Sequence, residues 1–202
     1  MTARDPNIES DVRALVRKIV DGMLGADSDE AAPSETAPSP ASAPTADGES
    51  PVGSVAVGGD HGGFPLKERI AFRLKEQGYA VTDCGTDSTD AVDYPDIAAA
   101  VASQVASGSC DVGIVIDGAG IGSAMAANKV HGVRAALCYD VSTARNAREH
   151  NHANVLTLGA GLIGDALAWQ ITQEFLATPY GGGRHARRVD KINDLERTPV
   201  GG

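Results

Sequence analysis

From residue 54 onward, short apolar runs alternate with segments of helical periodicity, and this alternation constrains the fold more than any other feature of the chain. The runs predict five strands, at Val55–Val57, Ala80–Thr82, Val112–Ile116, Val133–Cys138 and Val155–Leu158. The segments that follow them predict helices at about Pro65–Gln77, Pro95–Ser107, Ile121–Lys129, Ser142–His150, Asp165–Ala177 and Arg184–Leu195. Successive strand–helix units predict an α/β fold, a doubly wound, Rossmann-like sheet of five parallel strands with helices on both faces.

The residues before this domain divide into two segments. Residues 1–25 predict an amphipathic helix, because apolar side chains recur on one helical face, at Ile8, Val12, Leu15, Val16, Ile19 and Met23. Residues 26–53 are rich in Ala, Pro, Ser, Thr, Glu and Asp and cannot build a core, so we expect a flexible linker. The expected organisation is a helix at 1–25, a linker at 26–53, a domain at 54–195 and a tail at 196–202.

The charge and hydropathy of the chain exclude several classes of partner. A formal net charge of −10 argues against nucleic acid, because phosphate contacts need a basic field. The longest apolar runs, such as Val112–Ile116, are far shorter than the ~20 residues of a transmembrane helix. The N-terminus also lacks the basic and apolar regions of a secretory signal peptide. We therefore expect a cytoplasmic protein with no nucleic-acid or membrane partner.

The loops after the strands are the first candidates for a site, since ligands bind beyond the carboxyl ends of parallel strands. Three of them are rich in glycine: residues 58–63 read GGDHGG, residues 117–123 read DGAGIGS, and residues 159–161 read GAG. Facing glycine-rich loops favour a pocket for a compact anion held by backbone N–H groups. Two alternatives are a nucleotide site, whose usual acidic ribose-binding residue is missing, and glycines that only permit tight turns.

The densest basic cluster of this acidic chain lies at residues 181–188, which read GGGRHARR. Arg184 and Arg188 are four residues apart, so a helix places both guanidinium groups on one face. A phosphate group is the ligand that this spacing favours. From these residues alone, a solvated basic helix end remains an equal alternative.

Several motifs occur in order through residues 54–195. They are Gly59–Phe64 with Leu66–Lys67, Asp83–Thr86, Val92–Asp96, Gly120–Gly122 with Ala126–Lys129, Gly132–Ala136, Arg148–Asn151 with Ala153–Val155, and Gly182–His185 with Arg188–Val189. With these motifs the chain resembles the type B ribose-5-phosphate isomerases and the related galactose-6-phosphate isomerase subunits. The resemblance covers nearly the whole domain.

The resemblance implies an aldose–ketose isomerase that interconverts ribose 5-phosphate and ribulose 5-phosphate by proton transfer through an enediolate. The substrate-binding residues that it implies are Asp60, His61, Gly118, Gly120, Gly122, Asn151, Arg184 and Arg188. Among them, Arg184 and Arg188 would bind the phosphate, and the glycine loop would stabilise the enediolate oxygen. His150 would assist the opening of the furanose ring, and Tyr94 is expected either to close the pocket or to pack in an interface.

The resemblance also implies a homodimer, or a dimer of dimers, whose sites are completed across the interface by the C-terminal basic helix. Aldose–ketose chemistry needs a base, donors for the oxyanion and an anchor for the substrate, and it requires no metal or organic cofactor. Cys84, Cys110 and Cys138 show no spacing typical of a zinc site or a disulfide framework.

Three positions depart from the family pattern. Asp117 stands where the family has a cysteine base, and Ala119 stands where it has a threonine that assists ring opening. Gly161 stands where the family commonly has an arginine near the phosphate. We favour Asp117 as the base that replaces the cysteine; alternatively it binds a hydroxyl or caps the following helix, and activity is altered or lost. The departures also leave open another sugar phosphate, such as a tetrose, hexose or deoxy-sugar phosphate, or a non-catalytic sugar-phosphate-binding scaffold.

The expected N-terminal helix on its linker resembles the encapsulation peptides of bacterial microcompartment cargo. Such a helix buries its apolar face in a partner, so residues 8–24 are expected to bind microcompartment shell proteins. The alternatives are a helix that folds back on its own domain and a membrane-surface anchor. Basic and acidic residues are balanced in this segment, which disfavours the membrane anchor.

Overall fold

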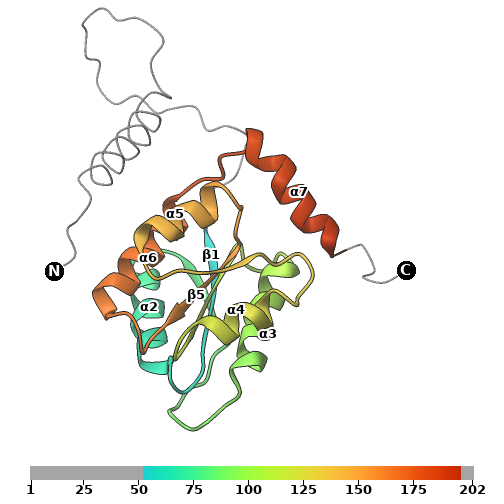
Figure 1. The fold of residues 1–202 in the computed structure, drawn as a ribbon. Helices are drawn as coiled ribbons and strands as arrows, with labels where there is room; N and C mark the ends of the chain where they lie inside the picture. The colour runs from blue at the N-terminus through green and yellow to red at the C-terminus, as the bar shows by residue number, and fades with distance from the viewer. Residues whose placement is uncertain (1–51, 197–202) are drawn as a thin grey trace, which may run out of the picture. The chain divides into compact units, whose positions relative to one another are not determined.

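A five-stranded sheet forms the centre of the computed structural model, which describes residues 52–196 (Figure 1). The strands are β1 (Ser54–Gly59), β2 (Ala80–Asp83), β3 (Val112–Asp117), β4 (Ala135–Leu137) and β5 (Val155–Gly159). All neighbouring pairs are parallel, in the order β2-β1-β3-β5-β4. The predicted parallel sheet is therefore confirmed. The expected helix at 1–25, and nearly all of the expected linker and tail, lie outside the described residues.

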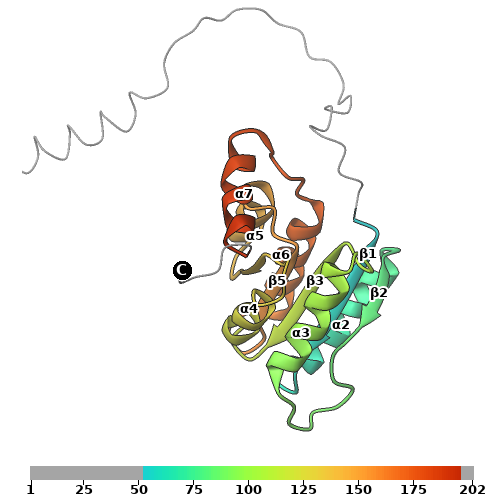
Figure 2. The ribbon, with the colours of Figure 1, turned by 90° about the vertical axis from the view of Figure 1, so that its right-hand side faces the viewer.

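The helices of the described residues cover both faces of this sheet (Figure 2). They are α2 (Phe64–Glu76), α3 (Tyr94–Ala106), α4 (Ile121–Ala127), α5 (Val141–Glu149), α6 (Asp165–Ala177), the 3₁₀ turn η1 (Gly183–His185) and α7 (Ala186–Leu195). Helices α2, α5 and α6 share one core cluster with the sheet, and α3 and α4 share the other. This two-sided cover is the doubly wound arrangement that the sequence predicts.

The strands form both clusters because successive side chains point to opposite faces. Val57 pairs with Ile114, and Ile114 pairs with Leu156, so three fully buried side chains lie in one row on one face. Ala56 and Val115 point to the other face. Central strands that are buried on both faces have nearly continuous apolar sequences. Their positions could therefore be predicted from the sequence.

The edge strand β4 is shorter than the predicted Val133–Cys138. The side chain of Asn128 bonds both the N–H and the carbonyl of Ala135, at 2.8 and 2.9 Å, and so ends α4 before the predicted Lys129. The Asn154 Oδ1 atom accepts the backbone N–H of Arg134 at 2.7 Å. Side-chain amides thus accept the backbone N–H groups at the start of β4, which hydrophobic periodicity cannot anticipate.

The last helix also begins differently from the prediction. Its first turn, which contains Arg184, is the 3₁₀ turn η1, and the α-helix starts only at Ala186. Gly182, before this turn, and Gly183, its first residue, both have positive φ, and they delay the regular helix. Within residues 52–196, no helix is long and apolar enough to cross a membrane.

The side chain of Lys67, on α2, forms hydrogen bonds with the end of β2 and the segment that follows it. The residue is 1 % exposed, and its Nζ lies 2.7 Å from Asp83 Oδ2 and 2.8 Å from the carbonyl oxygen of Thr86. Burial lowers the pKa of Lys67, but the hydrogen bonds and charges of Asp83 and Glu68 outweigh burial, so that the pKa lies above its ordinary value. The buried ammonium therefore stays charged and holds the start of the loop before α3.

Candidate active site

Two loops lie side by side where the carboxyl ends of β1 and β3 meet. Gly59 pairs with Ile116, so Asp60, the first residue after β1, lies at the same edge as Asp117, the last residue of β3. Helix α2 then leaves toward one face and α4 toward the other, which opens a crevice between the loops. A Cβ atom at Gly63 would lie 2.0 Å from the carbonyl oxygen of Ile116, so only glycine lets the first loop cross β3 this closely.

Asp60 and His61 occupy the first loop. Asp60 is 7 % exposed, and its Oδ1 accepts the backbone N–H of Gly63 at 2.8 Å. His61 is exposed, and its Nδ1 accepts the backbone N–H of Val92 at 3.3 Å. An accepting Nδ1 leaves the proton of a neutral imidazole on Nε2. His61 can therefore donate a hydrogen bond from Nε2 to a sugar hydroxyl or a phosphate oxygen.

Asp117 ends β3 and is 4 % exposed. Its Oδ1 accepts the backbone N–H groups of Ala119, at 2.7 Å, and of Gly120. Its Oδ2 accepts the backbone N–H of Ser123, at 3.1 Å, and the Ser123 hydroxyl. Both carboxylate oxygens are thus occupied by donors of the following loop. These contacts are those expected of a carboxylate that caps the loop and the start of α4.

The glycine loop of residues 118–122 is held in place by neighbouring strand ends. The Tyr139 hydroxyl donates to the carbonyl of Ala119 at 2.9 Å, and the backbone N–H of Gly161 donates to the carbonyl of Gly118 at 2.9 Å. Within residues 52–196, the N–H of Gly118 has no hydrogen-bond acceptor. In the first turn of α4, Gly122 has no intrahelical acceptor either. Two N–H donors therefore remain for a substrate oxygen.

Tyr94 lies against this loop. A Cβ atom at Gly122 would lie 2.5 Å from the Tyr94 ring, so the ring packs directly on the glycine backbone. The side chain is 41 % exposed, and Asp93 precedes it as the first residue before α3. Tyr94 thus borders the crevice, and its two expected roles, closing the pocket or packing in an interface, stay predictions.

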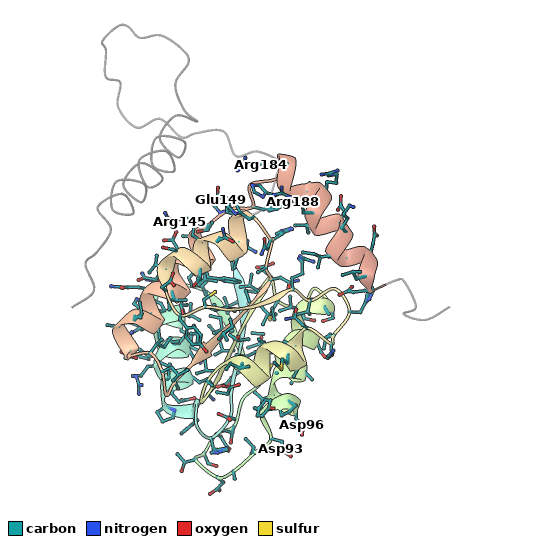
Figure 3. The ribbon with its side chains drawn as sticks, viewed as in Figure 1. Asp93, Asp96, Arg145, Glu149, Arg184 and Arg188 are labelled. Atoms are coloured by element: carbon teal, nitrogen blue, oxygen red, sulfur yellow. The ribbon has the colours of Figure 1, made fainter. Side chains whose placement is uncertain are left out.

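The basic residues form a separate cluster at the other end of the sheet. His150 follows α5, Asn151 comes next, and both Arg184 and Arg188 are exposed on η1 and α7. The rings of His150 and His185 are stacked with centroids 4.2 Å apart. Figure 3 shows Arg184 and Arg188 close to Glu149 at the end of α5.

The two groups of predicted site residues do not meet within one chain. Asn154, four residues after His150, accepts a hydrogen bond from Gly113 at the amino end of β3, whereas Asp117 is the carboxyl end of the same strand. Gly113 and Asp117 are four residues apart along β3, which corresponds to roughly 13 Å and exceeds the length of a five-carbon sugar phosphate. In Figure 3, Asp93 accordingly lies at the opposite end of the domain from Arg184.

Sequence reasoning missed four contacts that shape these clusters. Ser123, Tyr139 and the Val92 backbone orient Asp117, the glycine loop and His61, and His185 stacks on His150. Ser123 has a recognisable signal, because serine at the third position of a helix commonly bonds a preceding capping carboxylate. The others depend on loop geometry that no spacing rule encodes.

Comparison with known proteins places the domain among sugar isomerases. A family model described as Ribose/Galactose Isomerase matches residues 55–192. The chain is 44 % identical over 143 residues to ribose-5-phosphate isomerase B of Escherichia coli (strain K12), an alignment that covers 71 % of this chain and 96 % of that protein. It is 42 % identical over 139 residues to a putative sugar phosphate isomerase of Rickettsia conorii, covering 69 % and 96 %.

Solved structures agree with the sequence comparison. The structure of ribose-5-phosphate isomerase B from Clostridium thermocellum matches with a TM-score of 0.71 and 50 % identity, covering 71 % of this chain and 97 % of that chain. That of ribose-5-phosphate isomerase B from Mycoplasma genitalium with bound ribulose-5-phosphate matches with a TM-score of 0.69 and 44 % identity, covering 71 % and 96 %. The doubly wound fold predicted from the sequence is the fold of these proteins.

Proposed function

Because the chain belongs to the ribose/galactose isomerase family as a sugar-phosphate isomerase, we propose that the sugars it interconverts are ribose 5-phosphate and ribulose 5-phosphate. One observation carries this proposal. At the ends of β1 and β3, a buried carboxylate and a histidine face a glycine loop that has free N–H donors. A proton acceptor beside donors for an oxyanion is what enediolate chemistry requires.

In the proposed reaction, the sugar ring opens first. The C1–O4 bond breaks, O4 takes a proton from His150, and the anomeric hydroxyl releases its proton to solvent as the aldehyde forms. A base then removes the proton from C2 and returns it to C1, while the proton of the C2 hydroxyl moves to O1. Gly118 and Gly122 donate N–H groups to the enediolate oxygen, and Arg184 and Arg188 bind the phosphate.

Asp117 has two possible roles in this scheme. As the base, it would exchange one of its hydrogen bonds for the proton at C2. As a cap, it would only shape the loop, whose four donors occupy its carboxylate in the free enzyme. Asp60 would then be the alternative base, since within residues 52–196 only its Oδ1 has a hydrogen-bond donor.

We also propose that the enzyme is a homodimer, or a dimer of dimers, in which each site is completed by the second copy. The support is the separation of the two clusters: Asp60 and His61 lie at the carboxyl ends of the strands, and His150, Asn151 and Arg188 at the amino ends. A symmetric pair that brings unlike ends together forms two equivalent sites.

A coupled assay over a panel of sugar phosphates tests the proposed substrate. The panel contains ribose 5-phosphate with one tetrose, one hexose and one deoxy-sugar phosphate. We expect the highest kcat/KM for ribose 5-phosphate. A higher value for another sugar moves the proposal to that sugar, as the altered Ala119 and Gly161 would allow, and no turnover of any sugar favours a binding scaffold.

For the N-terminal segment, we propose that residues 8–24 bind a microcompartment shell protein. The support is the apolar stripe from Ile8 to Met23, in residues outside those that the structure describes. Deletion of residues 1–25 should abolish co-sedimentation with shell proteins and leave kcat unchanged. Equal co-sedimentation of the deleted and full-length chains would contradict this proposal.

A further inference from the structure

His150 and His185 form a stacked pair of imidazole rings at the amino end of the sheet. Their centroids are 4.2 Å apart and their planes differ by only 7°. His150 follows α5 and His185 lies on η1, so the pair joins the two elements that carry the basic cluster. Both residues are half-buried. A backbone hydrogen bond of 2.9 Å from Gly181 to Glu149 closes the same junction.

The hydrogen bonds of the pair place its protons. Nε of Arg184 donates to Nε2 of His185 at 3.4 Å. A ring nitrogen that accepts from a guanidinium carries no proton, so His185 is neutral here, with its proton on Nδ1. On the other ring, Nδ1 of His150 lies 2.8 Å from the side-chain amide of Asn146.

The charges around the pair oppose protonation. The charged groups that face it are Glu149 from α5 and Arg184 and Arg188 from η1 and α7. Burial, the neighbouring His150 ring and the two arginines lower the pKa of His185, and Glu149 offsets part of this effect. Two imidazolium rings at stacking distance would repel each other, so the pair holds at most one added proton.

We propose that His185 of this stacked pair is uncharged in the free enzyme and takes up one proton when an anion binds Arg184 and Arg188. An anion cancels the charge of the two guanidinium groups and draws Arg184 away from Nε2 of His185, which frees that nitrogen for a proton. His185 is then the positioning residue that couples anion binding to the charge of the pair.

This inference rests on the proposed function at one point, the role of Arg184 and Arg188 as phosphate ligands. If they bind the substrate phosphate, the ring stacked on His150 gains a proton only when substrate is in place. The proton needed at the ring oxygen would then be taken up when the substrate binds. In the empty site the two arginines oppose the positive charge that this proton brings.

Titration calorimetry of the full-length protein with sulfate tests this coupling. Sulfate carries two negative charges and does not titrate near neutral pH, so any proton taken up comes to the protein. Binding is measured at pH 7.5 in two buffers of different ionisation enthalpy, and the difference in apparent enthalpy gives the number of protons. We expect the wild type to take up a measurable fraction of one proton for each sulfate bound.

Two variants identify the group that takes up the proton. His185→Phe keeps a flat ring on His150 but has no titratable nitrogen, and His185→Gln keeps an acceptor for Arg184. We expect both to lose at least about half of the proton uptake, with sulfate affinity within about threefold of the wild type. His131→Gln is the matched control, because His131 is an exposed histidine beside Glu196. Its proton uptake should equal that of the wild type.

Three results would overturn the proposal: no proton uptake by the wild type, undiminished uptake by both His185 variants, or no binding of sulfate. The isomerase assay of the wild type is a separate measurement. Proton uptake without turnover of ribose 5-phosphate would remove the proposed substrate and leave the coupling. Normal turnover without proton uptake would remove the coupling and leave the proposed substrate.

Discussion

At the residue scale, Asp117→Asn separates the two roles of Asp117. If Asp117 is the base, loss of its charge should lower kcat on ribose 5-phosphate by about 10²–10⁴, since general base catalysis is worth about that much. We expect this result with KM changed much less, because the substrate hydroxyls and phosphate keep their ligands. The measurement is steady-state kinetics of the variant beside the wild type.

Ser123→Ala and Asp60→Asn are the comparisons that make this experiment decisive. Ser123→Ala removes one hydrogen bond to Asp117 and keeps the carboxylate, so it reports the cost of disturbing the loop. Full activity of Asp117→Asn together with a large loss in Asp60→Asn would transfer the role of base to Asp60. Asp117 would then be only the cap of the glycine loop.

Gly161 offers a second prediction at this scale. A Cβ atom there would lie 2.9 Å from the carbonyl oxygen of Gly118, so Gly161→Ala must push the glycine loop away. We expect kcat/KM to fall about tenfold or more, because small displacements of groups that hold a reacting oxygen are costly. The control is Gly164→Ala, where a Cβ atom meets nothing within 4 Å and φ is −77°. Equal activity of both variants would show that the close approach of the two loops has no role.

At the residue scale, the sequence predicted which of the candidate loops lie side by side. Asp60, His61 and the glycine loop came together because residues that follow neighbouring parallel strands must lie at one edge of the sheet. The orientation of Asp117 could not be predicted in the same way. It depends on four donors supplied by a turn with positive φ at Gly120, and strand order carries no information about that turn.

At the element scale, Lys67 is the main polar link between α2 and the segment after β2. Lys67→Ala removes a buried side chain and leaves Asp83 and the Thr86 carbonyl without their donor. We expect the free energy of unfolding to fall by about 2–4 kcal/mol, measured by urea denaturation. Lys67→Met should cost less, because it keeps the apolar stem and Asp83 is partly exposed to water.

Lys75→Ala is the matched control for this helix. Lys75 is exposed in the last turn of α2, and its loss should change the unfolding free energy by less than about 0.5 kcal/mol. If Lys67→Ala were no more destabilising than Lys75→Ala, the hydrogen bonds of the buried ammonium would make no net contribution to the free energy of unfolding.

The central elements were predictable, and the edge was not. β1, β3 and β5 are buried on both faces, so their apolar runs mark them directly. β4 has only half-buried residues, and its limits are set by the side chains of Asn128 and Asn154. Similarly, the 3₁₀ turn before α7 follows from glycine dihedral angles rather than from the helical pattern of charges and apolar residues.

At the scale of the whole molecule, the predicted site residues are divided between the two ends of the sheet. The carboxyl end holds carboxylates, His61 and the glycine loop, and the amino end holds His150, Asn151 and the two arginines. The sequence located these residues but not their separation, because it gives the order of strands and helices without the length of strand between the clusters.

Mixing two inactive variants tests whether two copies complete each site. One variant is Asp60→Asn with Asp117→Asn, and the other is Arg184→Ala with Arg188→Ala; each should be nearly inactive alone. A hybrid dimer has one site with both pairs of substitutions and one site with none, because each site takes one end from each chain. The purified hybrid, selected with two different affinity tags, should therefore regain about half of the wild-type activity per dimer.

Hybrids of the wild type with each variant are the controls, and each should also keep one intact site in two. If both ends of one chain served the same substrate, the hybrid of the two variants would have no intact site, although each control hybrid would keep half of its activity. An inactive hybrid beside two half-active controls would therefore exclude a shared site. Activity restored by mixing instead requires that the ends of two chains meet, as we propose from their separation along β3.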